Sequence, residues 1–178
     1  LLGGAKDLGA AGVDTVFGWG LLDVSKAANG PSNFAWGDFN VFAQASLMLQ
    51  YTVQTGPAST PIDALDTLFY PVDLRARAGV SWNNEGWGAG LTAIYVDDYR
   101  DNISTPARDV DEWLTWDAQV SYDWSGETER AGPQITLNVQ NLFDEDPPFT
   151  NNPVGYAFDA QAHSPLGRFV SLELRQRW

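Results

Sequence analysis

The sequence predicts an all-β protein, an antiparallel meander of about six long strands that forms part of a transmembrane β-barrel. A short N-terminal segment containing one helix is expected to precede the strands. Two observations carry this prediction. Apolar and polar residues alternate over long runs after residue 40, which is typical of strands with one apolar and one polar face. The connections alternate between long and short, as in outer-membrane barrels with long loops on one side only.

The six alternating runs have lengths near the 9–11 residues that a tilted transmembrane strand needs. In the second run, Val72, Leu74 and Ala76 alternate with Asp73 and Arg75. The third run has small or apolar residues on both faces and is the least decisive. We expect strands over residues 41–53, 72–82, 87–96, 113–124, 134–140 and 169–178.

The connections of residues 54–71, 98–112 and 143–167 are long, whereas those of 83–86 and 125–133 are short. Loops of more than about 12–15 residues are uncommon in compact soluble domains. The acidic loop 97–112 lacks the ligand spacing of an EF-hand, so we expect it to be solvated rather than to bind a cation. A soluble antiparallel sandwich with one buried face remains the alternative, because alternation alone does not separate the two.

Composition excludes several functions. With 23 Asp and Glu against 10 Lys and Arg, the 178-residue chain has a net charge of -13, so nucleic acid would repel it. It has no cysteine for disulfides or thiolate metal sites. No motif predicts a cofactor, a metal or a phosphate loop. The only histidine, His163, is expected to be a solvated loop residue rather than a base.

Two basic residues, Arg75 and Arg77, fall on the polar side of the second run. In a barrel that side lines the lumen, where charges are hydrated or paired. On the lipid side each arginine would cost about 2–4 kcal/mol at the bilayer midplane. We therefore expect both side chains to face the lumen. Six strands are fewer than the eight of the smallest outer-membrane barrels, so we do not expect this stretch to span the membrane alone.

Residues 132–178 resemble the C-terminal end of TonB-dependent outer-membrane receptors. The resemblance rests on the segment Asn138-Val-Gln-Asn-Leu-Phe-Asp-Glu-Asp-Pro-Pro148 and on Pro165-Leu-Gly-Arg-Phe-Val-Ser-Leu-Glu-Leu-Arg-Gln-Arg-Trp178. With weaker likenesses upstream, it covers about residues 41–178. It implies a cell outer membrane location, contact with outer-membrane lipid, and import of scarce ligands driven by TonB through an N-terminal plug. The plug is missing here, so the ligand is unknown and transport by this chain alone is not expected.

The resemblance also assigns a role to the last strand, which the barrel-assembly machinery of that family is believed to read. An apolar edge strand fits this role, because an assembly factor can add a strand to it. The residues that would carry the assembly signal are Phe169, Val170, Leu172, Leu174 and Trp178.

Residues 1–37 resemble a different family, the C-terminal end of subtilisin-like autotransporter serine proteases. The likeness lies in residues 7–31, where Gly18-Trp19-Gly20 precedes an expected helix over 21–28. That family's Gly-Thr-Ser nucleophile motif and its catalytic Asp and His motifs are absent, so we expect no enzyme activity. The alternative function is therefore a remnant of such a protease. Two family endings and an initial Leu suggest a gene fusion, a misassembled reading frame or a truncated piece of a longer protein.

Overall fold

The computed structural model describes residues 5–6, 21–23, 36–56, 58–124 and 132–176. These residues form strands and no helix, which confirms the predicted all-β class. The strands are β1 (Ala5–Lys6), β2 (Leu21–Asp23), β3 (Asp38–Leu47), β4 (Thr52–Val53), β5 (Ile62–Asp63), β6 (Leu74–Asn84), β7 (Trp87–Val96), β8 (Tyr99–Asp101), β9 (Arg108–Val110), β10 (Trp113–Asp123), β11 (Pro133–Gln140) and β12 (Phe169–Gln176).

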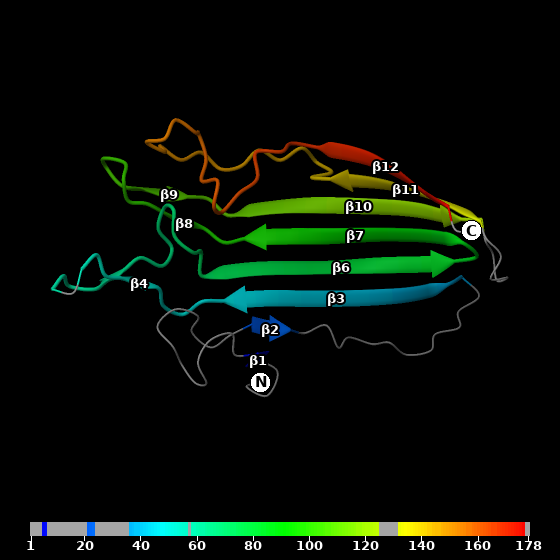
Figure 1. Ribbon diagram of the computed structural model, residues 1–178, viewed down its shortest axis with the longest axis horizontal. Coiled ribbons are helices and arrows are strands. Elements are labelled where there is room, and N and C mark those ends of the chain that lie inside the picture. Colours follow the sequence, from blue (N-terminus) through cyan, green and yellow to red (C-terminus); the bar gives the residue numbers. More distant parts are fainter. Residues whose placement is uncertain (1–4, 7–20, 24–35, 57, 125–131, 177–178) are drawn as a thin grey trace.

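One antiparallel sheet organises the molecule, with strand order β1-β2-β3-β6-β7-β10-β11-β12 (Figure 1). Its six long strands, β3, β6, β7, β10, β11 and β12, form the meander that the alternation predicted, and each has 8 to 11 residues. Within the described residues, β1 and β12 stand at the two ends of this order and do not pair with each other. Over the described residues the sheet is therefore open.

The register keeps apolar residues on one side of all six long strands. Val80 lies opposite Leu91, Val120 opposite Leu137, and Leu137 in turn opposite Leu172. Because a slip of one residue would turn every side chain to the other side, this register produces a continuous apolar face. Its exposed large side chains are Phe39, Val41, Leu47, Val80, Trp87, Leu91, Leu114, Val120, Leu137, Val170, Leu172 and Leu174.

The expected helix over residues 21–28 is wrong at its start. Residues 21–23 form β2, which pairs with Gln44, Ala45 and Ser46 on the outer edge of β3. The edge of β3 offers unpaired backbone donors and acceptors, and strand addition satisfies them, whereas a short isolated helix is marginal. The remainder of the expected helix lies outside the described residues. In the part of the chain that the structure describes, no helix is long and apolar enough to cross a membrane.

The long connections gather at one end of the sheet, at the left of Figure 1. They carry two small hairpins, β4-β5 and β8-β9, so the predicted first strand ends at Leu47 and its remainder contributes to β4. A buried core also lies here rather than under the sheet. This loop core consists of Leu68, Val72, Val96, Tyr99, Val110, Trp113 and Ala162.

At the opposite end, β6 and β7 are joined by the two-residue turn Glu85–Gly86, with φ angles of 46° and 88°. Positive φ at both positions matches the twist of the flanking strands. A β-carbon on Gly86 would lie 2.6 Å from the backbone oxygen of Asp123, whereas one on Gly90 in β7 would meet nothing nearer than 3.8 Å.

We therefore expect Gly86→Ala to lower the free energy of unfolding by roughly 1–3 kcal/mol, because the turn would be both strained and crowded. Gly90→Ala is the matched control and should change it little. Urea unfolding of each variant in detergent micelles, followed by tryptophan fluorescence, measures the difference. Equal effects of the two substitutions would contradict the turn geometry.

Candidate functional site

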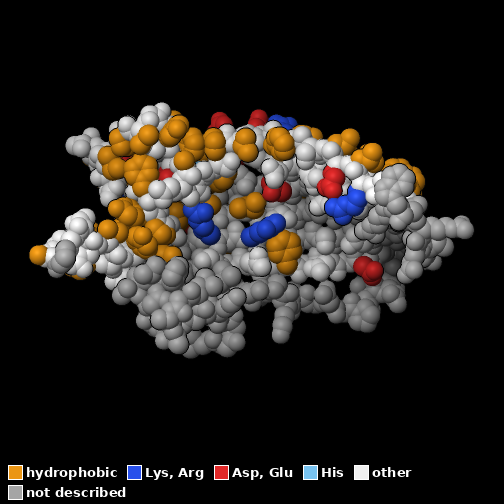
Figure 2. All heavy atoms as spheres, viewed as in Figure 1, with side chains coloured by type: hydrophobic (Ala, Val, Ile, Leu, Met, Phe, Trp, Pro, Cys, Tyr) orange, Lys and Arg blue, Asp and Glu red, His pale blue; other side chains and the backbone are white. Residues whose placement is uncertain are grey.

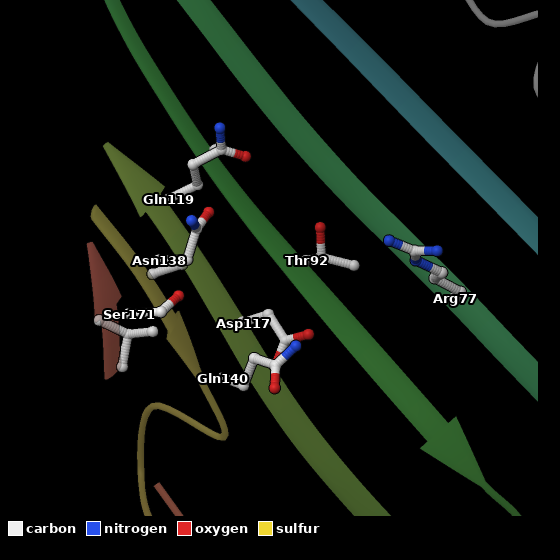
Figure 3. A pocket seen from close by; sticks show the side chains of 10 residues that line it. Arg77, Thr92, Asp117, Gln119, Asn138, Gln140 and Ser171 are labelled. Carbon is white, nitrogen blue, oxygen red and sulfur yellow. The ribbon is translucent and has the colours of Figure 1, made fainter. Parts of the chain in front are cut away.

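A polar hollow of about 300 Å³ lies on the side of the sheet opposite the apolar face. Its side chains come from five neighbouring strands, β6, β7, β10, β11 and β12 (Figure 3). We call this side of the sheet the polar face, and Figure 2 shows basic and acidic side chains on it. The residues that line the hollow are Arg77, Gly90, Thr92, Asp117, Ala118, Gln119, Asn138, Val139, Gln140 and Ser171.

Glycine creates the depression. Gly90 lies opposite Gln119 in the β7–β10 register, so a position without a side chain adjoins a long one. Gly79 lies opposite Thr92 on the other side of β7, and the ring of Phe42 covers it, 2.6 Å from where a β-carbon would stand. Gly90, which lines the hollow, is therefore open, whereas Gly79 lies outside the hollow under an aromatic ring.

Two opposite charges lie in the hollow. The Arg77 guanidinium carbon lies 5.6 Å from the centre of the Phe42 ring, a cation–π arrangement. The Asp117 carboxylate accepts a hydrogen bond from the backbone N–H of Asn141 at 2.9 Å. Among the described residues, the ion pairs join Arg100 to Asp109, Arg168 to Asp144 and Arg175 to Glu173. Arg77 and Asp117 thus share one hollow without forming an ion pair with each other.

Arg75 has a different environment from Arg77 although both lie on the polar face of β6. Its Nη2 donates to the carbonyl oxygens of Gln161 at 3.3 Å and Ala162 at 3.5 Å. Arg75 therefore fastens the last long connection to the sheet, while Arg77 lines the hollow. That this face borders a lumen stays a prediction for both residues.

The expectation of a solvated loop histidine is wrong, because His163 is only 5% exposed. Its Nε2 lies 3.2 Å from the Tyr99 hydroxyl, and its ring stacks on Tyr99 and meets Trp113 edge-on. Burial lowers the pKa of His163 to about 4, with Arg75 adding to this and Asp159 opposing it. The imidazole is neutral at pH 7, and its buried Nδ1 has no hydrogen-bond partner among the described residues.

Asp101 corrects the expectation of a uniformly solvated acidic loop, since it is fully buried. Its carboxylate accepts hydrogen bonds from the N–H groups of Ile103, Ser104 and Asn151 and from the Ser104 hydroxyl. Burial raises the pKa of Asp101, but these hydrogen bonds together outweigh it and hold the pKa below its usual range. Asp101 thereby ties residues 98–112 to the last long connection.

Asp159 performs a similar task in that connection. It is fully buried, and its two carboxylate oxygens accept from the N–H groups of Phe69 and Gln161, both at 2.9 Å. No group of three or more potential metal ligands occurs within the described ranges. Sequence reasoning missed these buried acids. The only local signal is the spacing of Asp101 and Ser104, which suits a side-chain-capped turn.

The terminal strand places its predicted assembly residues at an edge. Val170, Leu172 and Leu174 lie on the apolar face of β12, with Leu172 68% exposed, and Phe169 lies exposed at the start of that strand. Trp178 lies outside the described residues. The role of these residues in barrel assembly stays a prediction.

Comparison with curated proteins finds partial relatives, among them an autotransporter lipoprotein. The chain is 45% identical over 60 residues to the Neisserial autotransporter lipoprotein NalP of two Neisseria meningitidis serogroup B strains, MC58 and H44/76, a match covering 34% of this chain and 6% of the relative. It is 59% identical over 34 residues to serotype-specific antigen 1 of Mannheimia haemolytica, covering 19% of this chain and 4% of that protein. The chain thus spans a small part of these relatives' length. No family model and no solved structure matches it.

These relatives support the resemblance to autotransporters and give no support to the resemblance to TonB-dependent receptors. Together with the all-β sheet, they agree with the predicted outer-membrane location. The alternative function, an autotransporter remnant, is therefore better supported than the receptor. The division into segments 1–37 and 41–178 stays a prediction.

The buried histidine predicts a pH dependence. In the unfolded chain His163 takes up its proton near pH 6.5, whereas in the folded chain it does so near pH 4. Its contribution to stability is therefore complete above about pH 6.5 and is lost as the pH falls towards 4, by at most about 3 kcal/mol. Because His163 is the only histidine, NMR of the ¹⁵N-histidine-labelled protein reports its titration directly. A midpoint near 6.5 would contradict the burial.

The hydrogen bonds of Asp101 predict that Asp101→Asn loosens the long connections. An amide offers one acceptor oxygen in place of two, so a buried donor loses its partner, at a cost of roughly 1–3 kcal/mol. Asp109→Asn is the control, because the Asp109 side chain is 76% exposed and its ion pair with Arg100 lies at the surface. Hydrogen exchange of residues 98–112 should accelerate in the first variant and stay unchanged in the second.

Proposed function

We propose that the chain is a piece of an outer-membrane β-barrel domain of the autotransporter type. Its apolar face contacts lipid and its polar face borders the aqueous interior. The observation that carries the proposal is the register, which keeps the six long strands apolar on one side and polar on the other. The partial likeness to the autotransporter lipoprotein NalP adds independent support.

The exposure of the apolar face favours a membrane over a soluble sandwich. A sandwich would cover this face with a second sheet, but the other sheets among the described residues are two-stranded hairpins at the loop end. Val120 and Leu137, near the middle of their strands, are 45% and 43% exposed. A contiguous apolar surface of this extent marks contact with lipid or with another protein.

Aromatic rings at the turn end of the strands fit the same reading. Trp87, Tyr122 and Trp124 form a chain of ring contacts with centroids 4.7 Å apart at each step. On the neighbouring strands, the Trp82 indole donates to the carbonyl oxygen of Trp36, whose ring lies 4.9 Å from Phe39. Such rings at one level suit a membrane–water interface.

The open sheet implies that further strands complete the barrel. In lipid every backbone donor and acceptor requires a partner, so both edges of the sheet must be paired there.

We infer that this chain does not act as a protease. His163 contacts Tyr99 rather than a serine, and the Gly-Thr-Ser motif is absent.

A barrel segment of a TonB-dependent receptor is the second candidate, and it rests on the resemblance of residues 138–148 and 165–178 to that family. The residues that carry that resemblance form one joint between β11 and β12. Asn141 exchanges two hydrogen bonds with the backbone of Glu145, and Asp144 accepts from the N–H of Arg168 and pairs with its guanidinium. In that case TonB would engage only a plug supplied by other sequence, and the barrel-assembly machinery would read β12.

The proposed lipid contact predicts unequal effects of the same substitution at neighbouring residues of β10. Val120→Arg should make folding into phosphatidylcholine vesicles less favourable by about 2–4 kcal/mol, because the charge would enter the hydrocarbon core. Gln119→Arg, on the polar face, is the matched control and should have little effect. Urea titration of the vesicle-bound protein measures both, and a larger loss for Gln119→Arg would reverse the assigned faces.

The genomic sequence upstream of the chain separates the two candidates. An in-frame Gly-Thr-Ser motif favours the autotransporter protease, whereas a plug domain favours the receptor. Heat-modifiable mobility of the detergent-extracted protein tests membrane integration in either case. Full solubility without detergent would contradict both candidates.

A further inference from the structure

We propose that the polar hollow binds a small zwitterionic solute of the α-amino acid class, with the solute carboxylate on Arg77 and its ammonium group on Asp117. The inference deepens the proposed function, and it rests on the polar face being the aqueous side of the sheet.

The walls of the hollow exclude an apolar ligand. Apart from Arg77 and Asp117, the side chains that reach into it are the amides and hydroxyls of its other polar lining residues. Ala118 and Val139 contribute to the lining, but strand alternation points their side chains to the apolar face. Ligands of mainly apolar character need apolar or aromatic walls. None of the residues that line the hollow is aromatic, so a sugar ring would find no surface for stacking.

The charges specify the ligand further. Arg77 on β6 and Asp117 on β10 lie on either side of β7, and Figure 3 shows Thr92 between them. Each is held by its own neighbour, Arg77 by the Phe42 ring and Asp117 by the Asn141 N–H. A simple anion would face the carboxylate of Asp117, and a simple cation would face the guanidinium. A neutral solute that carries both charges satisfies both walls.

Hydrogen bonding is compatible with this placement. A guanidinium binds a carboxylate with two parallel hydrogen bonds. Oδ1 of Asp117 accepts from Asn141, and its other carboxylate oxygen can accept from an ammonium group. The side chains of Gln119, Asn138 and Gln140 both donate and accept, so they can meet a polar side chain of the solute. The absence of a side chain at Gly90 leaves the space for it.

L-Glutamine and three capped derivatives test the proposal against the whole chain refolded in detergent micelles. Calorimetric titration compares L-glutamine with its N-acetyl derivative, its C-terminal amide and the doubly capped compound. We expect each single cap to weaken binding at least tenfold and the double cap to abolish it. Equal affinity for the free and doubly capped compounds, tighter binding of a neutral sugar such as sucrose, or no binding of L-glutamine would each overturn the proposal.

Variants assign the two ends of the solute. Arg77→Gln should remove the advantage of a free carboxylate while keeping that of a free ammonium group, and Asp117→Asn should do the reverse. Arg75→Gln is the matched control, since Arg75 lies on the same face of β6 but donates to the carbonyl oxygens of Gln161 and Ala162. The affinity of this variant for L-glutamine should be unchanged. Far-ultraviolet circular dichroism confirms that each variant folds. Insertion of the whole chain into vesicles is scored separately. A chain that inserts but does not bind L-glutamine overturns the ligand assignment alone.

Discussion

Backbone pairing in a single register across five strand interfaces is the constraint on which the rest of this molecule depends. Neighbouring side chains alternate between faces, so the register decides the environment of every residue at once. Val120 pairs with Leu137 on the apolar face, and their neighbours Gln119 and Asn138 pair with each other on the polar face. The polar hollow is a product of the same register, because the register places Gly90, which has no side chain, opposite Gln119.

A different constraint applies at the loop end, since the regular structure described in the three long connections is limited to two small hairpins. The connections pack around a small apolar core and two buried carboxylates. Asp101 and Asp159 replace the hydrogen bonds that water would make to backbone N–H groups of loops far apart in sequence. Arg75 then joins the final connection to the polar face. Two of the chain's carboxylates thus stabilise the loops, although many of the others remain at the surface.

The open edges connect the fold to its proposed role. A sheet with an exposed apolar face and unpaired edges is a hazard in water, because it invites aggregation. In a membrane the apolar face is satisfied by lipid, and closure by further strands satisfies the edges. The autotransporter relatives are far longer than this chain, which covers 6% of the first of them. Under the proposed function, a piece of a larger barrel accounts for the apolar face, the open edges and the polar face together.

The sequence by itself determined the strands and their faces, because alternation is local and survives in any fold that uses strands. The runs around Leu74, Val120 and Leu172 predicted their strands and the side on which Arg75 and Arg77 lie. Only the tertiary structure decided the rest. The partner of β2 is the edge of β3, the burial of His163 depends on Tyr99, 64 positions away, and Asp101 reaches Asn151 across 50. Likewise Arg77, Asp117 and Ser171 meet in one hollow because pairing brings β6, β10 and β12 into one sheet, and contacts over such separations leave no periodic trace in the sequence.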